Sequence, residues 1–356
     1  MSVRINRNEI LGHFDIGAVT ESYGNGHIND TFLVTMPRYI LQRINTSIFR
    51  NPEELMENIE NVTGFLREKL GEAGEDFERG TLQVVPAKDG GSFYKVDDDN
   101  VFRVYRFVEG TKSIENSKTP KDLYEAGVGF GRFQKLLADF PVEKLHETIQ
   151  DFHHTPKRIE ALREAIRQDR AGRAGSVQRE IDFALENASW ADCVVKGMEA
   201  GRIPVRVTHN DTKINNILFD RDTGKAVCVI DLDTVMPGSM LYDFGDALRI
   251  GGSSAAEDET DLDKVWFEEG AFEAFAKGYL SEMRETLTEA EMALLPLSVK
   301  LMTYECGIRF LTDYLNGDTY FKIHREHHNL DRARNQFKLV ADIGNKEARL
   351  AQLVGD

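Results

Sequence analysis

Two stretches of this 356-residue chain contain residue types that can assist the transfer of a phosphoryl group. In "THNDTKINNILFD", His209, Asp211 and Asn216 form the pattern His-x-Asp-x-x-x-x-Asn, and the apolar run "AVCVIDLD" reaches Asp231 twenty residues after Asp211. An aspartate in such a loop can take the proton of an acceptor hydroxyl. Carboxylate and amide oxygens are suitable ligands for Mg²⁺. We therefore predict Asp211 as the catalytic base and Asn216 and Asp231 as Mg²⁺ ligands.

A structural explanation exists for each of these residues alone. Asp and Asn gather in turns because their side chains bond the local backbone. The joint pattern is more specific, because it combines the Asp211–Asn216 spacing with strand-like flanks ("VRV" and "ILF") and a second strand that ends in Asp231. This combination favours the catalytic interpretation.

The stretch "ESYGNGHINDTFLV" places Gly24 and Gly26 in a turn between two strand-like segments. Glycines in such a loop let backbone N–H groups approach the phosphates of ATP, although ordinary hairpin turns also use glycine. The position of this stretch ahead of the other motifs favours a phosphate-binding loop. We predict that Gly24 and Gly26 contact the nucleotide.

The next strand, "YILQRIN", lacks the lysine that a protein kinase uses at this point. Gln42 and Arg43 stand there instead, and they point to opposite faces of a strand, so only one can reach the nucleotide. We name Arg43, which keeps the positive charge, and leave Gln42 open as the alternative. Glu57 or Glu60 on the following helical segment is a candidate ionic partner, or simply part of a solvated helix face.

A strand-rich N-terminal third gives way to helices. Alternation predicts strands in "RYILQRIN" and in residues 81–110, with a helix over residues 51–70 between them. Later helices are expected over residues 122–140, 176–198, 265–283 and 288–315. The predicted fold is α+β, a protein-kinase-like fold of two lobes, with a nucleotide-binding lobe over 1–107 and a mostly helical catalytic lobe over 108–356. "YRFVEG" is the expected hinge, where backbone groups of Phe107 and Val108 would bond the adenine.

Composition narrows the classes of function. The formal net charge of −16 and pI near 5.1 argue against a nucleic-acid or membrane-surface partner, since phosphate groups attract basic faces. Neither a signal peptide nor a membrane-spanning run is evident. Cys193, Cys228 and Cys306 match no disulfide or zinc spacing. We expect a reduced, cytoplasmic protein, and the sequence leaves the oligomeric state open.

The motifs carry a family resemblance. The run from "VTHNDTKINNILFD" to "IDLDTVMPGSMLYDFGD" resembles the aminoglycoside phosphotransferase superfamily, and with "YGNGHIND", "YILQRIN" and "ECGIRFLTDYLNGDTYF" the chain looks like the N-acetylhexosamine 1-kinases almost end to end. The resemblance implies ATP- and Mg²⁺-dependent phosphorylation of the anomeric hydroxyl of N-acetylglucosamine or N-acetylgalactosamine. It also implies that Asp211, His27, Arg309 and Tyr320 contact the sugar.

Other interpretations remain open at this point. Without the resemblance, Arg309 and Asp313 would most simply form an ion pair on a helix, four residues apart. A different small-molecule kinase of the superfamily is the closest alternative, and a nucleotide-binding pseudokinase is a more distant one. The letters Asp-Phe-Gly at residues 243–245 lie too far beyond Asp211 to be the metal loop. We expect Asp243 to brace the catalytic loop or to cap the next helix.

Overall fold

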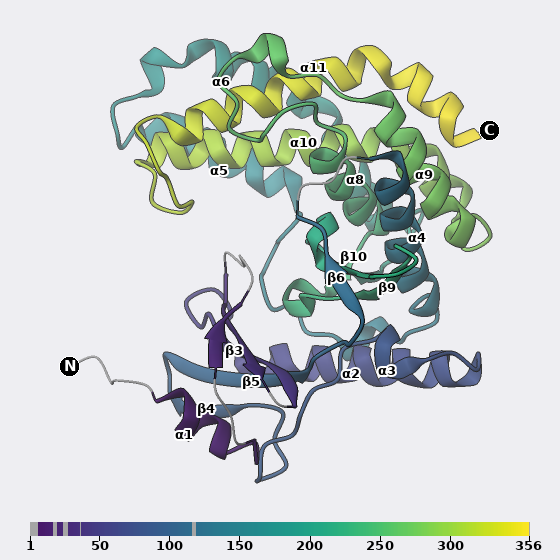
Figure 1. The fold of residues 1–356 in the computed structure, drawn as a ribbon. Coiled ribbons are helices and arrows are strands. Elements are labelled where there is room, and N and C mark those ends of the chain that lie inside the picture. The colour runs from purple at the N-terminus through teal and green to yellow at the C-terminus, as the bar shows by residue number, and fades with distance from the viewer. Residues whose placement is uncertain (1–5, 17–19, 24–27, 36, 116–118, 356) are drawn as a thin grey trace. The chain divides into compact units, whose positions relative to one another are not determined.

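The computed structural model describes residues 6–16, 20–23, 28–35, 37–115 and 119–355 (Figure 1). The chain folds as two compact units, each described here by itself. The first unit comprises Met1–Lys112, Asp139–Gln150 and Leu218–Pro237, and the second comprises Ser113–Ala138, Asp151–Ile217 and Gly238–Asp356.

The first unit is built on a five-stranded sheet in the order β1-β2-β3-β5-β4, with antiparallel neighbours. The strands are β1 (Thr20–Ser22), β2 (Asp30–Thr35), β3 (Arg38–Ile44), β4 (Tyr94–Asp97) and β5 (Asn100–Arg106). The strands expected in "RYILQRIN" and in residues 81–110 are thus confirmed as β3 and the β4–β5 pair. Residues 81–93 contribute only an isolated bridge, Val84 to Tyr105.

The two faces of this sheet have different coverings. On one face, Leu41 and Val104 belong to a buried apolar cluster with residues of α1 (Arg7–Gly12). Side chains alternate along a strand, so Gln42 and Arg103, which pair with each other in the β3–β5 register, project from the opposite face. Gln42 and Arg103 therefore lie on the face opposite the Leu41–Val104 cluster.

Helix α2 (Pro52–Glu72) confirms the prediction for residues 51–70. Asn51 caps its start by accepting a hydrogen bond from the Glu54 backbone N–H, and proline occupies the first turn, where it costs no helical hydrogen bond. The helix buries one stripe of side chains, among them Leu55, Met56, Asn58, Ile59, Val62 and Leu66.

Two later segments of the chain complete the first unit. The amide nitrogen of Asn58 donates to the carbonyl oxygens of His146 (2.9 Å) and Val235 (3.0 Å), and Arg79 forms an ion pair with Asp220 (2.8 Å). The short elements of this unit are α3 (Phe77–Gly80), β6 (Thr111–Ser113), η1 (Val142–Lys144), β8 (Ile217–Asp220), β9 (Ala226–Val229) and η5 (Leu232–Thr234), of which β6, β8 and β9 form a three-stranded sheet. The predicted division at residue 107 did not include these two segments.

The second unit is mainly helical (Figure 1). Its longer helices are α4 (Pro120–Leu136), α5 (Thr155–Gln168), α6 (Gln178–Glu186), α7 (Cys193–Glu199), α8 (Met240–Gly251), α9 (Glu269–Met283), α10 (Glu289–Asn316) and α11 (His328–Gly355). Its shorter elements are η2 (Ala174–Ser176), η3 (Asn187–Trp190), β7 (Arg206–Thr208), η4 (Ile214–Asn216) and η6 (Leu262–Lys264), and the chain enters it through β10 (Met236–Gly238).

Helices α4 and α9 approach each other closely. A Cβ atom at Gly127 would lie 2.2 Å from the carbonyl oxygen of Phe275, and one at Gly278 would lie 2.0 Å from that of Tyr124. Both distances are far below van der Waals contact, so these two glycines permit the packing of the two helices.

The α+β class, with a strand-rich N-terminal region and a helical C-terminal region, is confirmed. The helix expected over residues 176–198 is divided in the structure into α6, η3 and α7. No helix in the described ranges is both long and apolar enough to cross a membrane.

Candidate active site

The loop that follows β7 carries the predicted catalytic aspartate. Thr208, His209 and Asn210 are buried, and Asn210 takes a left-handed backbone conformation (φ 64°). The side chain of Asp211 is 18% exposed, so it can reach a substrate. The ring of His209 packs edge-on against Phe130 of α4, which holds the start of the loop in the core.

Asp243, in the first turn of α8, braces this loop. Its carboxylate accepts the backbone N–H groups of His209 (2.8 Å) and Asn210 (2.7 Å) and the side-chain amide of Gln134 (2.6 Å). Burial raises the pKa of Asp243, although these hydrogen bonds and the nearby His209 oppose the shift. The bracing role expected for Asp243 is confirmed, whereas the cap of α8 is Ser239.

The other two letters of Asp-Phe-Gly have packing roles. Phe244 is fully buried and meets Phe272, Phe275 and Tyr279 edge-on. A Cβ at Gly245 would lie 2.4 Å from the carbonyl oxygen of Ser298, so this glycine lets α8 pack against α10. The triplet therefore supports the catalytic loop from the buried side, through the hydrogen bonds of Asp243 and the packing of Phe244 and Gly245.

Asn216 and Lys213 both bond Asp211. The Asn216 amide nitrogen donates to the backbone carbonyl oxygen (2.8 Å) and the carboxylate (3.1 Å) of Asp211, and the Lys213 ammonium lies 2.6 Å from the same carboxylate. Burial disfavours the charged form of Lys213, but Asp211 outweighs it, and the pKa of Lys213 is raised. The sequence interpretation missed Lys213, although a lysine two residues after the predicted base was a usable signal.

Asp231 lies just after β9 in the first unit. Its backbone is left-handed (φ 61°), and it precedes the 3-10 turn η5 that contains Asp233. No group of three or more His, Cys, Asp or Glu side chains suited to a metal occurs in the part of the chain that the structure describes. Carboxylate and amide oxygens are the kind of ligand that Mg²⁺ prefers, and the metal roles of Asp231 and Asn216 stay predictions.

The residues predicted for the nucleotide differ in how they are placed. Gly24 and Gly26, and also His27 from the predicted sugar site, lie outside the described residues. The Phe107 N–H donates to the Arg38 carbonyl oxygen (3.3 Å), and the Val108 carbonyl accepts the Thr111 hydroxyl (2.7 Å). These contacts fix the chain that follows β5, and the adenine contacts of Phe107 and Val108 stay predictions.

Arg43 makes surface contacts. Its guanidinium forms an ion pair with Asp30 (2.6 Å) and contacts Asn100 (3.4 Å), and 42% of its side chain is exposed. Gln42 projects from the opposite face of β3, where its side-chain oxygen accepts two hydrogen bonds from Arg103. The nucleotide contact predicted for Arg43 finds no support in these interactions.

The segment after α10 presents Tyr320 to solvent. Its side chain is 67% exposed, and the carboxylate of Asp313 accepts the backbone N–H groups of Thr319 (2.9 Å), Tyr320 (2.8 Å) and Phe321 (2.9 Å). Asp313 is therefore occupied by this turn, and the ion pair with Arg309 that the spacing suggested is not among its contacts.

Arg309 is half-buried between aromatic rings. Its guanidinium carbon lies 5.7 Å from the ring centre of Phe152 and 5.5 Å from that of Phe321. Glu305, one helical turn before it, is already bonded to His153 (2.8 Å) and to the Thr155 hydroxyl (2.6 Å). Burial opposes the charged form of Glu305, but His153 and Arg309 outweigh it, and its pKa is lowered.

Within the second unit, a series of charged side chains lies between Arg309 and the catalytic loop. Asp246 interacts electrostatically with Lys213 and with His153, and His153 is the partner of Glu305. Of the residues predicted for the acceptor, Arg309 is related in this way to Lys213, the partner of Asp211.

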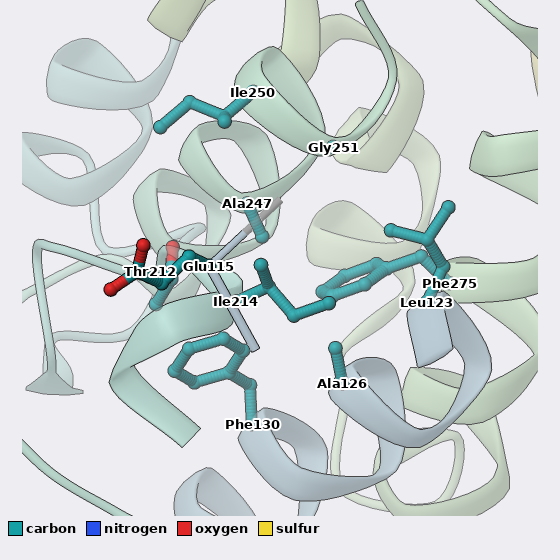
Figure 2. Close-up of a pocket in the computed structure, with 10 residues that line it drawn as sticks. All are labelled: Glu115, Leu123, Ala126, Phe130, Thr212, Ile214, Ala247, Ile250, Gly251 and Phe275. Atoms are coloured by element: carbon teal, nitrogen blue, oxygen red, sulfur yellow. The ribbon is translucent and has the colours of Figure 1, made fainter. Parts of the chain in front are cut away.

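A small apolar pocket lies beside the catalytic loop (Figure 2). Figure 2 shows Ile214 from the loop, Ala126 from α4 and Ala247 from α8 turned toward one another. Few polar groups line it, so it offers little to bind a sugar hydroxyl or a phosphate. It positions the loop through apolar contacts.

Comparison with known proteins agrees with this geometry. The sequence profile of a phosphotransferase enzyme family (APH) matches residues 19–287. An aminoglycoside phosphotransferase from Alicyclobacillus acidocaldarius superposes with a TM-score of 0.66 at 14% identity, over 100% of this chain and 98% of that one. A microcompartment-associated aminopropanol kinase gives 0.62 at 19% identity over 97% and 98%. Amicoumacin kinase hAmiN, solved with AMP-PNP, Ca²⁺ and its antibiotic, gives 0.59 at 15% identity over 92% and 88%.

At these identities the solved structures establish the protein-kinase-like fold and nothing finer. The profile match covers well over half of the chain, including the glycine segment and both aspartate motifs. On that evidence, this chain belongs to the phosphotransferase enzyme family.

Proposed function

We propose that the protein is an ATP- and Mg²⁺-dependent kinase that phosphorylates the anomeric hydroxyl of N-acetylhexosamines, giving a sugar 1-phosphate and ADP. Its kinase chemistry is supported by the arrangement of Asp211, Asn216 and Lys213 on a loop that Asp243 braces. A pseudokinase, by contrast, typically lacks one of the predicted base and metal ligands.

In the proposed reaction, Asp211 accepts the proton of the anomeric hydroxyl as that oxygen bonds to the γ-phosphorus of ATP. The bond from the γ-phosphorus to the bridging oxygen breaks, and ADP leaves. Bound Mg²⁺ would offset phosphate charge, with Asn216 and Asp231 as its predicted ligands. Lys213 and Asn216 hold the Asp211 carboxylate in one orientation, which keeps it aimed at the acceptor.

The observation that favours a neutral sugar over a cationic acceptor is the charge around Arg309. Burial lowers the pKa of the nearby Arg158, and the positive charge of Arg309 lowers it further. The carboxylates of Glu305 and Asp313, on the same helix as Arg309, are bonded to other groups of the protein. An aminoglycoside or amino alcohol would bring another positive charge next to these arginines, where Glu305 and Asp313 are already engaged. A sugar can instead use Arg309 and Tyr320 as hydrogen-bond donors and stack on an aromatic ring.

The test is to incubate the protein with ATP, Mg²⁺ and one acceptor at a time, and to follow ADP release. The acceptors are N-acetylglucosamine, N-acetylgalactosamine, their non-acetylated sugars, an aminoglycoside and an amino alcohol. We expect release with the N-acetylhexosamines, with phosphorus NMR placing the phosphate on the anomeric carbon. Release only with a cationic acceptor would disprove the sugar assignment but leave the kinase assignment intact.

Asp211→Asn tests the base in the same assay. The loss of a general base should lower kcat by about 10²–10⁴-fold. Asp263→Asn, which changes an exposed carboxylate in η6, is the matched control and should retain the wild-type rate. A near-normal rate for Asp211→Asn would show that another group takes the proton.

A further inference from the structure

The first unit contains a fully buried ion pair that includes none of the predicted site residues. The Arg103 guanidinium on β5 lies 2.6 Å from the carboxylate of Asp233 in η5, and the two side chains are 1% and 2% exposed. Charged side chains are rarely buried so completely, and removing one partner leaves an uncompensated charge. Such a pair in a sheet predicted to bind nucleotide calls for an explanation.

We propose that the Arg103–Asp233 pair replaces the strand lysine and helix glutamate of protein kinases, and that Arg103 is the positioning residue that holds the Asp231 turn and the base of the glycine segment for Mg²⁺–nucleotide binding. This inference rests on the nucleotide-binding part of the proposed function and not on the identity of the acceptor.

The first support is the position of Arg103 in the sheet. It stands directly opposite Gln42 in the β3–β5 register, and Gln42 occupies the strand where a kinase lysine is expected. Nε and Nη2 of Arg103 donate to the Gln42 side-chain oxygen at 3.0 and 2.9 Å. The cation therefore lies on the strand next to the one that carries the kinase lysine, on the same face of the sheet as Gln42.

The second support is the identity of the acidic partner. Glu57, a candidate on the helix after β3, instead bonds the ring of His146 at an exposed position. From that helix it is Met56 that faces Arg103, with its sulfur 3.8 Å from Nη1. The carboxylate comes from Asp233, so the acidic partner is supplied by the segment that carries the predicted metal ligand.

The third support is what the pair connects. Asp233 stands two residues after Asp231, and its other carboxylate oxygen accepts the Asn29 amide (2.6 Å). Asn29 in turn accepts the Asn45 backbone N–H at the end of β3 (2.9 Å). Burial disfavours the Arg103 charge, but Asp233, Tyr105 and Asp231 outweigh it, and the pKa of Arg103 is raised. One guanidinium thus joins β3, β5, the Asp231 turn and the residues that follow the glycine segment.

Arg103→Leu is the direct test, read out by calorimetric binding of ADP or AMP-PNP with Mg²⁺ and no acceptor. Residues that orient metal ligands typically change metal affinity by about 10–100-fold when they are replaced. We expect a weakening of that size, together with a higher Mg²⁺ concentration for half-maximal binding. Asp233→Asn, which nearly preserves the side-chain shape, should have the same effect and serves if Arg103→Leu does not fold.

A rescue variant separates positioning from simple loss of packing. In the double variant Gln42→Lys/Arg103→Leu, the cation returns to β3 on the same face and opposite the same residue. We expect it to recover Mg²⁺–nucleotide affinity to within about threefold of wild type, a much smaller difference than the 10–100-fold loss expected of the single variant. Lys69→Leu, which breaks the exposed Lys69–Asp139 pair of the same unit, is the control. It should leave nucleotide affinity unchanged.

Two results would overturn the proposal. One is that Arg103→Leu and Asp233→Asn lower the melting temperature but bind Mg²⁺–nucleotide as tightly as Lys69→Leu does. The other is that the double variant recovers stability but not affinity. The wild-type measurement separates the two proposals. If the wild type binds Mg²⁺–nucleotide and Arg103→Leu binds it equally well, only this inference fails, whereas a wild type that binds no nucleotide removes the proposed kinase function as well.

Discussion

Asp243 and Asp211 are carboxylates of the same loop assembly with different tasks. Asp211 is partly exposed and bonded by Lys213 and Asn216, whereas Asp243 is 2% exposed and receives two backbone N–H groups of the loop. The first can meet a substrate, and the second can only hold the loop in place. Burial alone therefore distinguishes the predicted base from its support.

Asp243→Ala should consequently act on catalysis through geometry. The change leaves the His209 and Asn210 N–H groups buried without their acceptor, at a cost of about 1–3 kcal/mol each to the free energy of unfolding. We expect kcat to fall, because the loop no longer holds Asp211 in place. Nucleotide affinity measured without acceptor should remain near the wild-type value.

Hydrogen exchange provides the structural readout for that variant. The amide hydrogens of His209 and Asn210 should exchange faster in Asp243→Ala. Glu289→Ala, which removes an exposed acidic residue from the first turn of α10, is the matched control and should leave both amides protected. An unchanged kcat together with faster exchange would mean that the loop tolerates the loss of its brace.

Some residue roles could be predicted from the sequence and others could not, for a physical reason. Asp243 could be anticipated because the distance from Asp211 excluded a metal role for it, and Lys213 adjoins the motif. Arg103 could not be anticipated, because its role depends on the register of β3 with β5 and on a contact with Asp233, 130 residues later. Alternation along one strand cannot reveal which residue of the next strand lies opposite.

Among the elements, the turn after α10 shows how one side chain organises a loop. Asp313 collects three backbone N–H groups and the amide of Asn329 (2.9 Å), which orders the segment that presents Tyr320. A carboxylate that accepts several backbone N–H groups fixes the path of the chain, because each donor would otherwise be left unsatisfied. The position of Tyr320, which is predicted to contact the sugar, therefore depends on this turn.

Asp313→Ala should weaken the binding of the acceptor more than that of ATP. The freed turn no longer holds Tyr320 in one place, so we expect KM for the N-acetylhexosamine to rise about tenfold or more, the equivalent of one lost charged hydrogen bond. KM for ATP should change little. Steady-state kinetics with each substrate varied in turn measures the difference.

Thr312→Ala is the control for that experiment, because the Thr312 hydroxyl bonds the Ile308 carbonyl oxygen of its own helix. It should leave both KM values unchanged. If Asp313→Ala raised the two KM values equally, the turn would have a general structural role and no special connection with the acceptor.

Periodicity located the helices better than it located their ends or interruptions. Residues 288–315 correspond closely to α10 (Glu289–Asn316), where Thr288 and Glu291 form a capping box. Residues 176–198 were expected to be continuous, but the chain passes through the 3-10 turn η3 (Asn187–Trp190). An apolar stripe continues in register across such a turn, so the pattern alone does not reveal the break.

For the whole molecule, the main result that the sequence could not supply is the discontinuity of the first unit. It recruits Asp139–Gln150 and Leu218–Pro237 to a sheet built from the first 112 residues. These segments satisfy buried groups of the sheet and of α2: Asp233 neutralises Arg103, and the carbonyl oxygens of His146 and Val235 accept the amide of Asn58. Contacts between residues so far apart leave no local pattern, which is why a single boundary at residue 107 was expected.

A fragment of residues 1–112 should therefore not fold by itself, although it contains all five strands of the sheet. It retains Arg103 without Asp233, and breaking a buried ion pair in this way costs about 3–5 kcal/mol. The fragment also lacks the partners of Asn58, and typical domains have only about 5–15 kcal/mol of stability in total. We expect weak far-ultraviolet circular dichroism and no cooperative thermal transition, whereas the full chain melts cooperatively.

Arg103→Leu in the fragment should then restore part of its structure, because the buried charge is removed with no partner left behind. A cooperative transition in the unmodified fragment would instead mean that the sheet and α2 are stable without the two later segments.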